Sequence, residues 1–166
     1  FEVLYAPKVR NAIHVKVQAV IDNLKNSGYD YAISKLSTDI GNSELSEVIR
    51  KLYTDVGLRH SRLTYRRIVV DQKKGFGFNA EWTKFITDYL NRFLLEKITF
   101  EVANTTRNAL LKALTAGIAL GWGVDDMVNQ LEHWPFERYQ AARIVRTEVN
   151  RASNVGSAAQ ESTSEY

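Results

Sequence analysis

Apolar residues recur at three- and four-residue spacing along most of this chain, and few helix-breaking residues interrupt them. The spacing is clearest over residues 7–25, 43–56, 79–94, 100–118 and 135–155. Glycine and proline together make up about half of their average share. The triplet Ile68-Val69-Val70 is the only β-like stretch. We therefore expect an all-α protein, an irregular helical domain of about six or seven helices.

Pro7 and Gly28 bound the first expected helix. Proline suits a first helical turn, and the apolar stripe that follows runs to Lys25. Ser27-Gly28 then ends the run, which predicts a separate short helix over 29–36.

The next helix is expected to begin at Ser43, a favourable N-cap residue. Its apolar stripe, continued past Gly57, meets several arginines, and one straight helix cannot bury all of them. Either the chain bends near Gly57, or the helix leaves the core and presents the arginines beyond it. Both interpretations make this basic segment an edge of the domain.

The second half of the chain predicts a long helical region followed by two further helices. The apolar register changes near residues 97–99, which predicts two helices or one kinked long helix between about residues 80 and 120. A short helix is expected over 124–134, and a last one from Pro135 past Ala152. The residues after Gly156 have little to bury, so we expect them to fray.

Positive charge is concentrated in one segment between Gly57 and Lys74. This segment holds six of the 22 basic residues and one of the 19 acidic ones, so the rest of the chain carries a net charge of −2. A solvated helix end is the commonest explanation of such a segment. The alternative is contact with an anionic partner or a nucleic-acid backbone, which would be weak, salt-sensitive and independent of sequence. The candidate contact residues are Arg59, Arg62, Arg66, Arg67, Lys73 and Lys74.

Several chemistries lack the residues that they need. No cysteine is present, and His14, His60 and His133 fall on three separate expected elements without the spacing of metal ligands. We expect no catalytic residue, no metal site and no cofactor. The longest uncharged run, residues 113–124, is too short to span a bilayer, so we expect no membrane contact.

Glu148 lies on the otherwise apolar side of the last helix. A carboxylate in that position needs a partner, because burying it unpaired is unfavourable. Arg151, three residues on, is one candidate, and an arginine or a helix N-terminus elsewhere is another. A structural ion pair is the favoured interpretation, a partner contact comes next, and a catalytic acid or base comes last.

The same helix resembles a known signature. The stretch 138–156 is similar to the signature of the phage Mu F-like minor head proteins, also called head-morphogenesis proteins. An Arg-Thr-Glu core is followed by an asparagine and a glycine, and these signature residues are Arg146, Thr147, Glu148, Asn154 and Gly156. Residues 98–131 resemble the paired helices that precede this core in the family, so the resemblance covers about Trp82 to Gly156.

The resemblance implies a structural virion component without enzymatic activity in this domain. Such a protein would act at the portal or in the procapsid interior during head assembly, with portal or capsid proteins and packaged DNA as partners. Its location would be the phage head, and the bacterial host cytoplasm during assembly. We expect an unassigned N-terminal helical region over 1–74 and a Mu F-like region over 75–166, in one compact unit cut from a longer protein.

Two other functions remain open from the residues alone. One is a nucleic-acid-binding helical module centred on Arg59 to Lys74. The other is an enzyme that uses Glu148 with Arg146 or Arg143 on a phosphate-bearing substrate, which requires an open pocket over Glu148.

Overall fold

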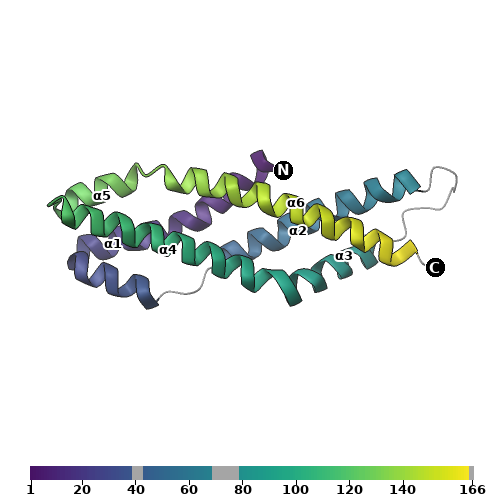
Figure 1. Cartoon of the computed structure of the whole chain (residues 1–166), viewed down its shortest axis with the longest axis horizontal. Helices are drawn as coiled ribbons and strands as arrows, with labels where there is room; N and C mark the ends of the chain where they lie inside the picture. Colours follow the sequence, from purple (N-terminus) through teal and green to yellow (C-terminus); the bar gives the residue numbers. More distant parts are fainter. Residues whose placement is uncertain (39–42, 69–78, 165–166) are drawn as a thin grey trace.

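The computed structural model describes residues 1–38, 43–68 and 79–164, and in these ranges the regular elements are all helical. The all-α prediction is therefore confirmed. Several elements join end to end, so that they form four long rods, fewer separate units than the six or seven helices expected (Figure 1). In chain order the elements are α1 (Glu2–Thr38), α2 (Ser43–Ile68), α3 (Asn79–Tyr89), the π-helical turn η1 (Leu90–Leu94), α4 (Leu95–Ala119), α5 (Val124–Glu132) and α6 (Phe136–Ser164).

The first rod, α1, changes direction at Gly28, where the sequence predicts a break between two helices. Gly28 has φ 79° and ψ −174°, a left-handed backbone that favours glycine. The helix begins at Glu2, so Pro7 lies inside it rather than in its first turn. The earlier start has a tertiary cause, because Tyr5 is fully buried and its hydroxyl donates a hydrogen bond to Asp55 of α2.

The second rod, α2, begins at Ser43 as predicted and continues without a break through Gly57. Of the two alternatives, a bend of the chain near Gly57 is therefore wrong. The helix does not leave the bundle either, because Ser61 is buried against α6 while Arg59 and Arg62 on another face are exposed. The Gly57 backbone is in contact with Gly156 and the Ser61 hydroxyl donates to the Gly156 carbonyl oxygen, so α2 remains packed on α6 beyond the point where its apolar stripe ends.

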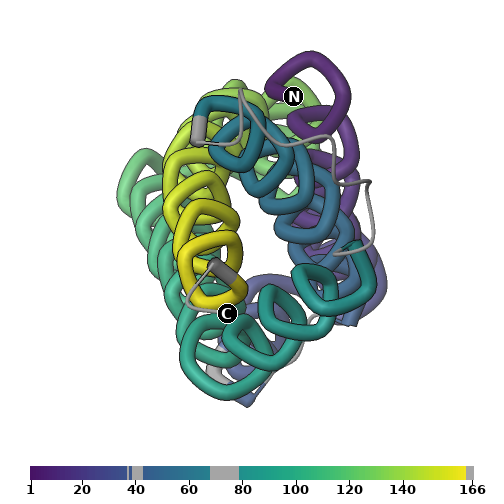
Figure 2. The backbone as a smooth tube through the Cα atoms, turned by 90° about the vertical axis from the view of Figure 1, so that its right-hand side faces the viewer, coloured from purple at the N-terminus to yellow at the C-terminus, as the bar shows by residue number. Residues whose placement is uncertain are grey.

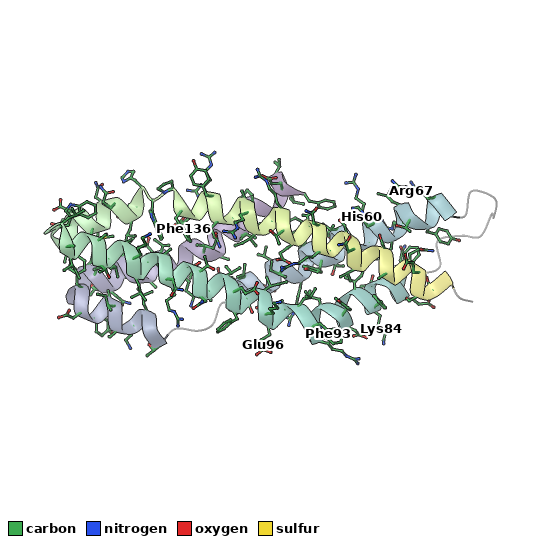
Figure 3. The ribbon with its side chains drawn as sticks, in the orientation of Figure 1. His60, Arg67, Lys84, Phe93, Glu96 and Phe136 are labelled. Atoms are coloured by element: carbon green, nitrogen blue, oxygen red, sulfur yellow. The ribbon has the colours of Figure 1, made fainter. Side chains whose placement is uncertain are left out.

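The kinked long helix expected between residues 80 and 120 is present as α3, η1 and α4. Its change of register lies at η1, a few residues before the predicted position. There the backbone N–H of Leu95 donates to the carbonyl oxygen of Leu90, five residues back, so the turn holds one residue more than an α-helical turn. The extra residue keeps Leu90 and Leu95 buried and directs Phe93, 63% exposed, away from the bundle (Figure 3).

The last rod contains α5 and α6, which follow a tight turn at Gly121 (φ 74°). Fraying after Gly156 is not observed, because α6 continues to Ser164 with Ala159 and Gln160 buried. The indole Nε1–H of Trp82 donates to the hydroxyl of Thr163 at 3.0 Å. A side chain from α3 therefore stabilises turns that have few apolar residues of their own.

The rods form an elongated bundle in which α6 extends along most of the length. It packs on α1 in one half of the molecule and on α2 and α3 in the other (Figures 1 and 2). The buried apolar residues form one core to which every α-helix contributes, with Val9, Ile49, Leu110 and Val145 among its most enclosed members. The N-terminus lies beside the middle of α6, where the two halves meet (Figure 1).

Candidate functional site

Gly156 lies where α6 crosses α2 in backbone contact. A Cβ atom at Gly156 would be 2.2 Å from the carbonyl oxygen of Gly57. The hydroxyl oxygen of Ser61 lies 2.6 Å from the Gly156 carbonyl oxygen and 3.0 Å from that of Gly57. The close approach of the two helices therefore requires a glycine at this position.

Glu148 is buried between α6 and α2, with its side chain 5% exposed. The Tyr53 hydroxyl donates to Glu148 Oε2 at 2.6 Å, and Arg151 Nη1 donates to Oε1 at 2.9 Å. Arg151 is the partner that the sequence suggested. Burial raises the pKa of Glu148 above its usual value, although the hydrogen bond from Tyr53 and the charge of Arg151 oppose this shift.

Arg146 lies on a different side of α6 from Glu148 and binds the first turn of α1. Its Nε and Nη2 atoms each donate to a carboxylate oxygen of Glu2 at 2.9 Å, a bidentate ion pair. This hydrogen bonding lowers the pKa of Glu2 below its usual value. The residues of the Arg-Thr-Glu core therefore hold two different helices, α1 through Arg146 and α2 through Glu148.

The two attachments come together near the N-terminus of the chain. Tyr5 and Asp55 link α1 directly to α2 there, so three helices are joined by polar contacts within a few helical turns. The remaining signature residues, Thr147 and Asn154, are exposed. Thr147 borders a groove between α4 and α6, and no contact in the described ranges explains Asn154.

The enzyme hypothesis requires an open pocket over Glu148, and this groove borders that residue. It has a volume of about 190 Å³ and is bordered by Glu101, Arg143, Thr147, Glu148 and Arg151. Both carboxylate oxygens of Glu148 already accept hydrogen bonds from protein donors. Arg143 borders the groove, whereas Arg146 does not and is engaged by Glu2. The structure therefore brings Glu148 and Arg143 to the border of one groove and leaves Arg146 outside it.

The basic edge is located on the C-terminal half of α2. Arg59, Arg62, Arg66 and Arg67 are all exposed. The guanidinium carbon of Arg59 lies 5.4 Å from the centre of the Phe1 ring, and Arg62 Nε donates to Asn79 Oδ1 at 3.1 Å. The other two candidates, Lys73 and Lys74, lie outside the described residues.

His60 and Arg67 both lie on the C-terminal half of α2 (Figure 3), and Arg59 directly precedes His60 in the chain. Burial lowers the pKa of His60, and the charges of the two arginines lower it further. The edge therefore carries a local positive potential that disfavours an additional cation and favours an anion.

Metal-ligating side chains do not gather in the part of the chain that the structure describes, where no group of three such residues is close enough to hold an ion. His14 instead binds Glu137, with its Nδ1 3.0 Å and 3.1 Å from the two carboxylate oxygens. Within the described ranges, no helix is both long and apolar enough to cross a membrane.

The α2 residues that contact Glu148 and Gly156 were not identified from the sequence. Tyr53, Gly57 and Ser61 follow one another at four-residue spacing, which places them on one face of a helix. That face combines a hydroxyl donor with two small residues, a pattern that favours close helix packing with a polar contact. The pattern was available in the sequence, but nothing local identifies α6 as its partner.

Comparison with protein-family models, with curated proteins and with solved structures found no match to this chain. The class is therefore defined by the fold and its contacts: an elongated all-α bundle whose last helix is fixed to two N-terminal helices by Arg146, Glu148 and Gly156.

Proposed function

We propose that this chain is a structural component of a phage or prophage head, a minor head protein of the Mu F-like type. It would act without enzymatic turnover at the portal or in the procapsid interior. The observation that supports this most is the use of the signature residues. Arg146, Glu148 and Gly156 each fix α6 to another helix, so the signature describes how the bundle is assembled.

The placement of Arg146 and Glu148 favours this function over catalysis by that pair. Arg146 and Glu148 contact different helices on different sides of α6, so they cannot act together on one substrate. Groups that share a catalytic step must come within hydrogen-bond reach of the same reacting atoms. A protein whose role is to present a shaped surface needs only a stable bundle, and these contacts supply it.

The proposal is tested by affinity purification from cells in which the encoding phage or prophage is producing heads. A tagged chain is expected to recover portal or capsid protein, and to be present in purified procapsids by quantitative mass spectrometry. Gly156→Ala, which weakens the α2–α6 crossing, is expected to reduce that recovery, whereas the exposed change Tyr139→Phe is not. Recovery of neither portal nor capsid protein, with the chain absent from particles, would contradict the proposal.

A second candidate function, binding of nucleic acid, is favoured by the exposed arginines of α2. Arg59, Arg62 and Arg66 follow three- and four-residue spacing, so they share a helix face that can track a phosphate backbone. Both functions can hold together, because a head protein in the capsid interior is close to packaged DNA.

Fluorescence anisotropy with a labelled random-sequence duplex tests this second candidate. Binding is expected to weaken steeply with salt, and the triple change of Arg59, Arg62 and Arg66 to Ala should lower the salt slope by about one for each lost phosphate contact. Arg92, Lys112 and Arg138, all exposed, provide a triple control that removes the same charge elsewhere. Equal losses in the two triple variants would show a general charge effect and would count against a specific arginine face.

A further inference from the structure

A cavity of about 320 Å³ lies between α1 and α4. The helix α1 borders it from both sides of its bend at Gly28, with Val20 in the first arm and Leu36 near the end of the second. Val102 and Leu110 of α4 form the facing wall. The two arms of α1 are joined at Gly28 (φ 79°) at one end of the bundle (Figure 1), and the bend there allows both arms to border the cavity.

The cavity combines apolar walls with positive charge. Most of its uncharged lining residues are aliphatic, with Asn23, Thr38 and Thr106 the polar exceptions. Lys16, Lys35 and Arg107 also line it, and none of its described lining residues is acidic. Arg107 Nη2 donates to Asn104 Oδ1 at 2.6 Å, and the guanidinium has further N–H donors for another acceptor. A concave site with this charge attracts anions.

Thr106 provides a second, independent indication of a ligand. This residue is 3% exposed, lines the cavity between Val102 and Leu110, and its hydroxyl oxygen has no hydrogen-bond partner among the described residues. A buried hydroxyl without a partner is unfavourable, because it has lost its hydrogen bonds to water. An oxygen atom of a bound molecule would accept its proton and remove that penalty.

We propose that this cavity binds a small amphiphilic anion, a carboxylate with an aliphatic body. The carboxylate accepts hydrogen bonds from Arg107 and Thr106 and is attracted by Lys35, while the aliphatic body packs against Val20, Val102 and the other apolar walls. The volume is at the lower end of the range for small-molecule pockets, which fits a short chain. Neither a neutral aliphatic alcohol nor inorganic phosphate satisfies both features of the site.

The test uses three probes on the purified chain, with binding followed by isothermal titration calorimetry and by NMR shifts of α4 residues. Octanoate carries both features, 1-octanol the aliphatic body alone, and inorganic phosphate the charge alone. Octanoate is expected to saturate one site with a Kd at least about tenfold below that of either other probe. The proposal is overturned if octanoate does not bind, or if either other probe binds as tightly.

Variants then locate the site. Thr106→Val and Arg107→Gln are each expected to weaken octanoate about tenfold, the loss expected for one hydrogen bond to a charged group. Ala103→Trp, which places a large side chain in the cavity, should abolish binding, and Arg138→Gln on the exposed face of α6 should leave it unchanged. Thr106→Val preserves shape and removes only the unpaired hydroxyl, so it tests the site even if Ala103→Trp does not fold. Wild-type affinity in a folded Thr106→Val variant would overturn the assignment.

Discussion

At the scale of single residues, Gly156 shows how little space separates α6 from α2. Gly156→Ala would place a methyl group against the backbone of Gly57, which cannot move aside as a side chain could. Overpacking of this kind costs about 3 kcal/mol, and the better helix propensity of alanine returns about 1 kcal/mol. We expect a net loss of about 2 kcal/mol in the free energy of unfolding, measured by urea denaturation with far-UV circular dichroism.

Gly123→Ala is the matched control for this change. A Cβ atom there would lie 3.9 Å from its nearest neighbour, Asp126 Oδ2, and φ is −69°, so alanine fits the backbone. Because Gly123 is the N-cap of α5, we expect a loss below about 1 kcal/mol. Equal losses at the two glycines would contradict the backbone contact at Gly156.

The raised pKa of Glu148 predicts the direction in which the stability of the folded chain changes with pH. Burial raises its pKa in the folded chain above the usual 4.5, so the folded state holds the proton more tightly than the unfolded state. Its contribution to stability is therefore fully present below pH 4.5 and is lost as the pH rises through the folded-state pKa. We expect the stability difference between the wild type and Glu148→Gln, measured by urea denaturation at several pH values, to fall as the pH rises from 4.5.

Glu2 is a control, because its pKa is shifted in the opposite direction and its contribution to stability should change with pH in the opposite sense. Its pKa is lowered by Arg146, so its contribution is present at neutral pH and is lost as the pH falls through the folded-state pKa. The difference between the wild type and Glu2→Gln should therefore rise with pH, while that for Glu148→Gln falls. The same slope in both variants would show that burial does not dominate at Glu148.

At the scale of elements, η1 acts as a one-residue insertion between α3 and α4. Deletion of the exposed Arg92 would allow a continuous α-helix with Ile86 and Ile98 still facing the core. We expect this variant to remain folded and to lose at most about 2 kcal/mol, as for an ordinary point change. Far-UV circular dichroism and urea denaturation provide the measurement.

Deletion of Lys112 in the regular part of α4 is the comparison. It would rotate every following residue of α4 by about 100°, which moves Leu114 out of the core. We expect loss of cooperative unfolding in that variant. Comparable damage from the two deletions would mean that η1 has a structural role beyond its extra residue.

At the scale of the whole molecule, α6 should make the two halves unfold together. It packs on α1 in one half and on α2 and α3 in the other, and Tyr53 and Glu2 fix it at the junction. Trp82 belongs to α3, whereas Trp122 and Trp134 flank α5, and these two helices lie at opposite ends of the bundle (Figure 1), so the tryptophans report on different halves.

A variant with Trp122→Phe and Trp134→Phe isolates the fluorescence of Trp82. We expect its fluorescence transition in urea to coincide with its far-UV circular dichroism transition, because the cooperative unit includes both halves. Trp82→Phe with the other two tryptophans retained should give the same agreement. Separate midpoints in either variant would show that α6 does not couple the halves.

The overall class and several boundaries were predictable because they depend on local properties. Apolar spacing predicts the helices, Ser43 predicts the start of α2, and Gly28 predicts the break in α1. The partner of Glu148 was predictable in the same way, since Arg151 is three residues away on the same helix. The bend near Gly57, one of two alternatives, was wrong because the missing side chain makes room for Ile86 of α3 and for backbone contact with Gly156 rather than for a turn.

By itself, the sequence therefore determined the helical class, several helix boundaries and the requirement that the Glu148 carboxylate have a partner. Only the tertiary structure decided which helices meet. Tyr53 and Glu148 are 95 residues apart, and Glu2 and Arg146 are 144 apart. Contacts between helices that are distant in sequence also bury Ala159 and Gln160 and form the cavity beside Thr106. Local spacing specifies which face of a helix is buried, but the partner of that face is chosen by packing among all the helices at once.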